Sequence, residues 1–225
     1  MLGIPGMAIS VVFGIQDKHV VSNQHNGIRF KRGVSPGLAI EQPACMREIR
    51  FLVVFSEGTL KQYSTIEYAV VDIQHIPYAD QSFDMIIANM MLYHVPDIPR
   101  ALSEVRRVLR KGGTFCCATY GENGIMEYLA GLFQEYGVTE EANHTFTLQN
   151  GKKQLQAYFD AVERYDYEDS LEVTDVNDLA DYIFSLTGMS SLRALPRETI
   201  IKVLNAASVD GVLKVPKEYG LFLSH

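Results

Sequence analysis

Two short apolar runs in the middle of the chain each end on a side chain that can hydrogen-bond a ligand. Asp72 directly follows the run at residues 68–71, and Asn89 directly follows the run at residues 83–88. Runs of this kind predict buried strands, and ligand sites in open α/β sheets lie outside the carboxyl ends of strands. The two polar residues therefore predict a binding site. Asp72 taken alone is equally well explained as a turn residue, and Asn89 as a loop residue that bonds its own backbone.

The loop after Asn89 carries two ring side chains that could move a proton. Histidine is the side chain whose chemistry best suits a general base near neutral pH, so His94 is a candidate for that role, and Tyr93 beside it is a second candidate. The alternative is that both rings only order the loop before the next helix. The sequence alone leaves both interpretations open.

Strand and helix patterns alternate around these residues, which favours a parallel sheet. Residues 51–55 predict a strand, and residues 56–62 predict a short helix capped by Ser56. Apolar residues recur at helical spacing over residues 97–110, where Asp97 can cap the helix and two glycines, Gly112 and Gly113, can end it. Further strands are expected at 114–120, 162–167 and 219–224, with helices at 124–136, 148–159, 175–186 and 197–206.

The first 49 residues form an atypical segment, because glycine and proline interrupt every periodic pattern. Residues 7–15 and 19–22 are candidates for short strands. We expect the first 30 or so residues to contribute little to the core on the ligand side.

Composition limits the classes of protein and partner. The chain has 225 residues, 47% hydrophobic residues and a net charge of −7, which fits one domain over residues 1–225 and argues against a nucleic-acid binder. Three cysteines without a C-x-x-C pair argue against a disulfide framework or a metal site and indicate the reducing cytoplasm. The apolar start is too short and too broken to span a membrane. A homodimer is left open.

Three segments in order resemble the middle of the class I S-adenosylmethionine-dependent methyltransferases that act on small molecules. They are D-I-Q-x-I-P-Y-x-D-x-S-F-D from Asp72, I-A-N-x-x-L-Y-H-V-P-D around Asn89, and A-L-x-E-x-x-R-V-L-R-K-G-G from Ala101. The resemblance implies a three-layer, Rossmann-like α/β fold of seven strands with the last strand antiparallel. It also implies a helical insertion near the C-terminus, so that residues 121–210 include helices that cover the substrate.

The resemblance implies S-adenosyl-L-methionine as cofactor and a small-molecule substrate. Asp72 and Ile73 would lie at the adenine, and the methionine half would be bordered by Asn89, Met90 and Leu92. Glu122 and Asn123 would face the substrate, although the glycines on either side of them also indicate a turn.

The sequence departs from the family pattern at two cofactor positions. The nearest match to the glycine-rich turn after strand one runs from Gly33 to Gly37, with Ser35 at the central glycine and two basic residues, Lys31 and Arg32, at the expected strand end. After strand two, Val54 stands where an acidic residue would hold the ribose, while the family's serine is kept as Ser56.

Two functions follow from these departures. One is an active methyltransferase with weakened cofactor affinity, in which Gly33, Gly37 and Ser56 still contact the cofactor. The other is a catalytically inactive methyltransferase-like binding or assembly protein. A nicotinamide dehydrogenase is disfavoured, because G-x-G-x-x-G is also missing.

Overall fold

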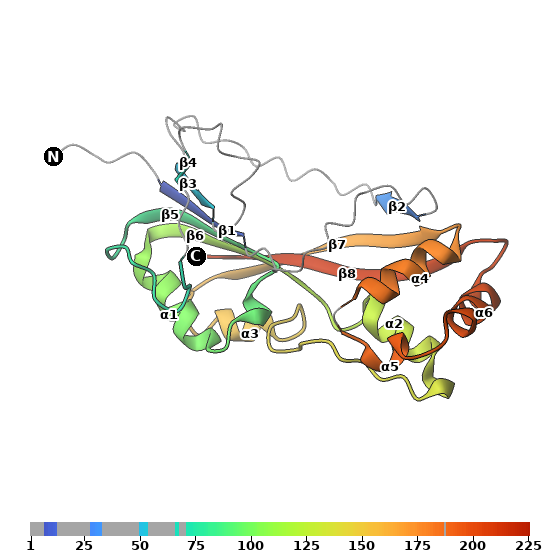
Figure 1. The fold of residues 1–225 in the computed structure, drawn as a ribbon. Coiled ribbons are helices and arrows are strands. Elements are labelled where there is room, and N and C mark those ends of the chain that lie inside the picture. Colours follow the sequence, from blue (N-terminus) through green and yellow to red (C-terminus); the bar gives the residue numbers. More distant parts are fainter. Residues whose placement is uncertain (1–6, 13–27, 33–49, 54–65, 68–70, 187) are drawn as a thin grey trace.

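The computed structural model describes residues 7–12, 28–32, 50–53, 66–67, 71–186 and 188–225. Its strands form one mixed sheet (Figure 1). From one edge to the other the sheet consists of β2 (Ile28–Arg32), β7 (Val162–Val173), β8 (Leu213–Ser224), β6 (Leu109–Tyr120), β5 (Phe83–Asn89), β1 (Met7–Val12), β3 (Arg50–Val53) and β4 (Ile66–Glu67).

The strand directions confirm the expected α/β fold. Strands β4, β3, β1, β5 and β6 pair in parallel, whereas the last strand, β8, is antiparallel to both β6 and β7. The edge strand β2 is also antiparallel to its neighbour β7. The sheet therefore has one strand more than the seven expected, because β2 extends it beyond β7.

The expectation that the N-terminus contributes little on the ligand side was wrong. Strand β1 lies between β3 and β5, in the middle of the parallel half of the sheet. The run M-A-I-S-V-V supplies it, and a short apolar, β-branched stretch suits a strand with neighbours on both sides. The strand expected within residues 7–15 is thus present, but the glycine-rich pattern around it did not reveal its central position in the sheet.

The placement of strand one just before Gly33 was also wrong. The strand that ends there, β2, pairs with β7 at the opposite edge of the sheet, and the position beside β5 belongs to β1. Gly33, Gly37, Val54 and Ser56 themselves lie outside the described residues, as do the strand expected at 19–22 and the helix expected at 56–62.

Helix α1 (Ile98–Val108) follows β5 and covers one face of the sheet. Its cap is the one expected, since Asp97 Oδ1 accepts a hydrogen bond from the Arg100 amide at 2.9 Å. The helix buries one stripe of apolar side chains, namely Ile98, Ala101, Leu102, Val105 and Val108. It ends earlier than expected, because Leu109 already begins β6.

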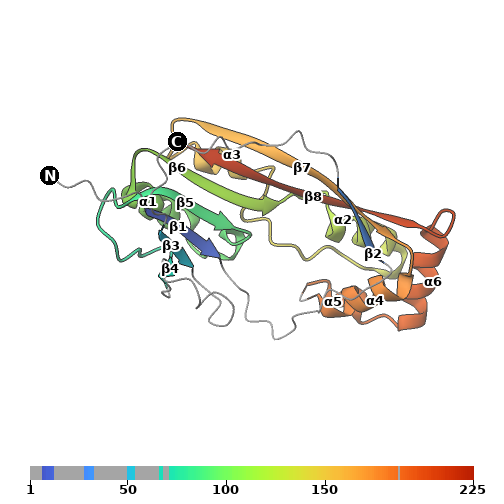
Figure 2. The same cartoon turned by 90° about the horizontal axis from the view of Figure 1, so that it is seen from above.

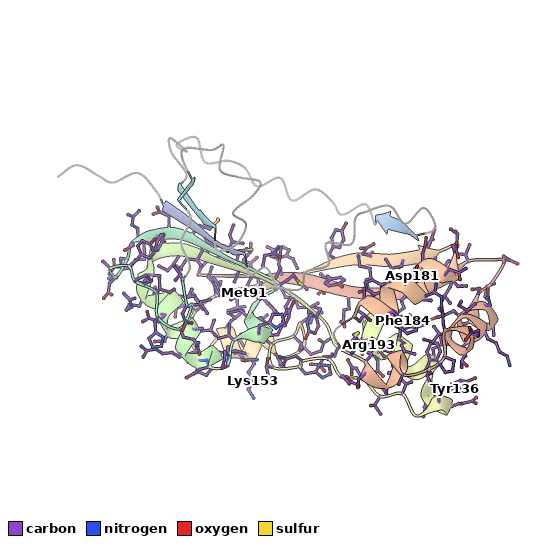
Figure 3. All side chains as sticks on the ribbon, viewed as in Figure 1. Met91, Tyr136, Lys153, Asp181, Phe184 and Arg193 are labelled. Carbon is purple, nitrogen blue, oxygen red and sulfur yellow. The ribbon has the colours of Figure 1, made fainter. Side chains whose placement is uncertain are left out.

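Below the same face lies α3 (Gly151–Leu155), which is much shorter than the helix expected at 148–159 (Figure 1). Residues from β5, β6, α1 and α3 form the first hydrophobic core. Met91, labelled in Figure 3, belongs to it and is fully buried.

The second core lies at the far end of the long β7–β8 ribbon (Figure 2). Here α2 (Ile125–Leu132), α4 (Val176–Ser185), α5 (Ser190–Arg193) and α6 (Arg197–Ala207) pack around the strand residues Leu171, Val173, Leu213 and Val215. The short 3₁₀ turn η2 (Gln134–Tyr136) follows α2. The expected helical insertion between the last two strands is thus present, and both strands are longer than their patterns indicated.

No helix in the described part of the chain is both long enough and apolar enough to cross a membrane.

Candidate functional site

The order of the strands reverses between β1 and β5. The later strands β3 and β4 lie beyond β1 on one side, and β6, which follows β5, lies on the other. The register pairs Val12 with Asn89, so both strands end at the same level. In open α/β sheets such a switch point is where ligands bind. Asn89, the last residue of β5, is exposed there.

A cavity of about 620 Å³ begins at the next residue, Met90. Its walls come from the loop after β5, the end of β6, α2, residues 140–143, α4 and the middle of β8. It therefore lies between the two hydrophobic cores. The lining residues with polar or ring side chains are Tyr93, His94, Tyr120, Glu122, Glu127, Glu140, Glu141, Asn143, Tyr182, Glu218 and Tyr219.

A strained residue turns the chain from β5 into the cavity wall. Met90 has a φ of 52°, a left-handed conformation that costs a non-glycine residue energy, and its amide donates to the Ala118 carbonyl at 3.0 Å. The 3₁₀ turn η1 (Leu92–His94) follows. Leu92 is buried in the first core, whereas Tyr93 and His94 line the cavity.

The Tyr93 ring is packed among other rings. Its centroid lies 4.4 Å from the His94 ring and 4.6 Å from the Tyr120 ring. Burial, with a smaller effect of Tyr120 and Tyr219, raises the pKa of Tyr93 to about 12. At neutral pH Tyr93 is therefore a neutral hydroxyl and cannot act as the base. His94 is exposed, and its role as the base stays a prediction.

The segment at residues 143–145 is hydrogen-bonded to two residues of the cavity wall, Tyr93 and Tyr120. Both the Asn143 amide group and the Thr145 hydroxyl donate to the Tyr93 carbonyl, the latter at 3.1 Å. The Tyr120 hydroxyl donates in turn to the Asn143 carbonyl. Hydrogen bonds therefore fix this segment of the cavity wall to η1 and to the end of β6.

Glu218 on β8 organises the wall opposite. Its carboxylate accepts hydrogen bonds from the backbone N–H of Asn123 at 2.7 Å and from Gln149 Nε2 at 2.8 Å. Its backbone carbonyl accepts one from the backbone N–H of Gly121 at 2.8 Å. Gly121 leaves the room for this side chain, since a Cβ there would lie 2.0 Å from Glu218 Oε2. The loop after β6 is therefore fixed by one residue of β8.

Replacing Gly121 by alanine should lower the free energy of unfolding by about 1 to 3 kcal/mol, because the Glu218 side chain must move and release both donors. Chemical denaturation measures the change. In a double-mutant cycle with Glu218→Ala, the same Gly121→Ala change should cost little, because the clashing side chain is gone. An equal cost in both backgrounds would contradict this packing.

The sequence found only part of this site. Tyr93, His94, Met90 and Glu122 lie together in the cavity wall, and Asn89 adjoins it. The sequence missed Glu140, Glu141, Tyr182, Glu218 and Tyr219, which belong to no motif and reach the cavity only through tertiary packing. Asn123 contributes its backbone amide to Glu218. The described residues contain no cluster of three His, Cys, Asp or Glu side chains suited to a metal ion.

Three residues that the resemblance placed at the cofactor make structural contacts within the protein. Ile73 and Leu92 are 2% and 0% exposed within the first core, so neither presents a surface to a ligand. Asp72 closes a turn: its Oδ1 accepts from the Gln74 amide at 2.9 Å, and its Oδ2 lies 3.3 Å from His75 Nδ1. The hydrogen bond from the Gln74 amide also lowers the pKa of Asp72. Its side chain remains about half exposed, so the adenine contact stays a prediction.

Comparisons with known proteins agree with this architecture. Residues 52–117 match the family described as "Methyltransferase domain". The methyltransferase GfsG of Streptomyces halstedii is 31% identical over 113 residues, which cover 50% of this chain and 38% of that protein. A malonyl-[acyl-carrier protein] O-methyltransferase of Yersinia pestis is 34% identical over 92 residues, covering 41% of this chain and 34% of that protein. The matches thus span little more than a third of these relatives.

A solved structure extends the likeness to most of the fold. It is a candidate methyltransferase from an antibiotic biosynthesis pathway of Anabaena variabilis, with a TM-score of 0.52, 16% identity, and coverage of 79% of this chain and 82% of that one. At this identity the likeness concerns the fold. Together with the sequence match over residues 52–117 and the reversal of strand order between β1 and β5, it shows that the chain has a Rossmann-like α/β fold similar to that of methyltransferases.

Proposed function

We propose that this protein transfers a methyl group from S-adenosyl-L-methionine to a small molecule held in the cavity. The observation that carries the proposal is the position of the cavity, which begins at Met90, one residue beyond the switch point between β1 and β5. A cofactor at the switch point and an acceptor in the cavity would be neighbours, and alignment of the two reactants is the main contribution that an enzyme makes to this reaction.

The described residues suit the hydrogen-bonding groups and the positive charge of the cofactor. The exposed Asn89 amide lies at the switch point, the half-exposed Asp72 carboxylate can still accept a hydrogen bond from an adenine amine, and the carboxylates of the adjoining wall favour a positively charged sulfonium. When bound, the cofactor supplies an activated methyl group. The protein's own part is to hold the acceptor between Tyr93 and the opposite wall, and to take up a released proton at His94.

Binding of S-adenosylhomocysteine tests this function. Calorimetric titration should give a dissociation constant below about 100 μM, roughly −5.5 kcal/mol. Asn89→Ala removes the exposed amide at the switch point and should weaken binding by about 1 to 2 kcal/mol, or about five- to thirtyfold. Asn205→Ala on α6 is the matched control, because Asn205 is also exposed but lies outside the cavity lining.

Absence of heat at millimolar S-adenosylhomocysteine would overturn the proposal and favour the inactive binding or assembly protein. Tight binding with equal affinities for wild type and Asn89→Ala would keep the function but move the cofactor away from the end of β5.

A further inference from the structure

We infer that the cavity recognises a substrate with a positively charged nitrogen, either an amine or a methylated ammonium group, held between tyrosine rings and glutamate carboxylates. This inference rests on the proposed function, because it names the substrate class of the same cavity. It depends on two features of the lining that are chemically independent of each other.

The first feature is the charge of the lining. Five glutamates from three separate parts of the chain face the cavity, and no lysine or arginine of the described residues is part of its lining: Glu122, Glu127, Glu140, Glu141 and Glu218. A cavity with this charge repels an anionic substrate and attracts a cation. Since the segments are distant in sequence, no single acidic run explains the arrangement.

Mostly neutral donors hold these carboxylates in place. Glu122 accepts a hydrogen bond from the Thr147 hydroxyl at 2.7 Å, and Glu141 accepts one from the Ser190 hydroxyl at 2.7 Å. Glu218 is held by Asn123 and Gln149, as described above. Such bonds orient a carboxylate without cancelling its charge.

Among the described residues, basic side chains approach three of the lining carboxylates from positions outside the cavity lining. Arg164 lies 4.0 Å from Glu218, Arg193 acts on Glu141 through space, and His144, which is charged only when protonated, lies 3.0 Å from Glu140. Two arginines, and one histidine that is a cation only when protonated, stand against five carboxylates, which leaves an excess of negative charge facing the cavity.

The second feature is the number of aromatic faces. Tyr93, Tyr120, Tyr182 and Tyr219 all line the cavity. Burial raises the pKa of both Tyr93 and Tyr182 to about 12, so these rings are uncharged and present π faces at neutral pH. One ring already contacts a cation, because Lys217 Nζ lies 5.1 Å from the centroid of Tyr219. Rings and carboxylates together form the kind of cage that binds ammonium groups.

The cage also suits the proposed reaction. The bound ammonium would first give a proton to His94. The neutral nitrogen would then use its lone pair to form the new nitrogen–carbon bond while the bond from methyl carbon to sulfur breaks and its electron pair stays on sulfur. The positive charge therefore passes to nitrogen. Carboxylates and ring faces around that nitrogen stabilise the charge as it develops, which is the arrangement that lowers a reaction barrier.

Choline and 3,3-dimethylbutan-1-ol provide a direct test, since they have the same shape and differ in the charge of one atom. Calorimetric or NMR titration of the full chain should show choline binding at least about tenfold more tightly, with the preference weakening as salt is added. Equal affinity for the two compounds, or tighter binding of malonate than of choline, would overturn the inference.

Matched variants separate the cage from unspecific charge. Glu122→Gln with Glu127→Gln should weaken choline binding about three- to tenfold, whereas Glu135→Gln with Glu198→Gln changes net charge equally outside the cavity and should leave it unchanged. Tyr93→Phe should retain choline binding, and Tyr93→Leu should reduce it about threefold or more, because only leucine removes the π face. Identical losses for the two pairs of glutamate changes would contradict a local cage.

A titration with S-adenosylhomocysteine on the same samples distinguishes failure of the cage from failure of the proposed function. Binding of S-adenosylhomocysteine without any preference for choline would reject the substrate class and leave the methyltransferase function standing. Preference for choline without binding of S-adenosylhomocysteine would reject the function and leave the cage standing.

Discussion

Replacing Gly220 with alanine is expected to destabilise the protein by about 2 to 4 kcal/mol, which lowers the melting temperature by about 4 to 16 °C in a chain of this size. Gly220 lies in β8 and pairs with Thr119 of β6 and Asp166 of β7. A Cβ at this position would lie 2.5 Å from the Tyr165 carbonyl oxygen and 3.0 Å from Leu148 Cδ2. The closest atom belongs to the backbone, so the strands themselves would have to separate.

The matched control for Gly220→Ala is Gly131→Ala. Gly131 lies in α2, and no heavy atom would come within 4 Å of its added Cβ. The same methyl group should therefore stabilise the protein by about 0.5 to 1 kcal/mol through helix propensity. Calorimetric or denaturant-induced unfolding measures both. A cost below about 0.5 kcal/mol for Gly220→Ala would mean that β7 and β8 do not approach each other here as described.

Arg107→Ala is the second change with a large expected effect, about 2 to 4 kcal/mol of lost stability. The guanidinium donates to Glu104 through both Nε and Nη2, to the Ile76 carbonyl at 2.8 Å and to the Tyr78 carbonyl at 2.8 Å. Its removal leaves Glu104, which is 13% exposed, without its cation. Arg107→Lys should recover only part of the loss, since lysine lacks the planar fork. Arg106→Ala, one position earlier, is the control. Equal melting temperatures for Arg106→Ala and Arg107→Ala would show that the hydrogen bonds of Arg107 do not stabilise the protein.

The ion pair between Arg107 and Glu104 also predicts how stability depends on pH. Hydrogen bonds from Arg107, with a contribution from the Ile76 amide, lower the pKa of Glu104 from 4.5 to about 2 in the folded protein. Because the folded value is depressed, this carboxylate stabilises the protein above about pH 4.5 and loses that effect as the pH falls toward 2. Glu104→Gln should therefore be less stable at pH 7 and show a flatter decline below pH 4.5. Thermal unfolding between pH 7 and 2.5 measures both slopes.

The elements that could be predicted from sequence are those whose stability is local. The helix at Ile98–Val108 follows from one apolar stripe and one cap, and β5 from one apolar run. The length of α3 was overestimated, because Thr147 and Asn150 form a turn before it. In this turn the backbone N–H of Thr147 donates to Asn150 Oδ1 at 2.9 Å. Strand β1 was undervalued, because its stability comes from two neighbouring strands that no local pattern reveals.

Only the site residues that follow a recognisable strand could be predicted from the sequence. Tyr93 and His94 could be found because they follow a recognisable strand, and Glu122 because it follows the next one. Glu218 and Tyr219 could not, since only the pairing of Tyr120 with Tyr219 brings β8 to the end of β6. Glu104 and Arg107 stand three positions apart on one helix, a spacing that predicts their ion pair but not the loop that both residues hold.

The ribbon of β7 and β8 makes the helical end of the molecule an exchangeable unit. Val173 and Leu213 are paired directly across the ribbon, so the 39 residues between them leave and re-enter the sheet at adjacent points. A segment joined in this manner can change in length or sequence without shifting strand register, as insertions between neighbouring ends generally can. Because this unit carries Tyr182 and Leu186 of the cavity wall, evolution or an engineer can alter what the cavity accepts by exchanging residues 174–212, while the switch point between β1 and β5 stays intact.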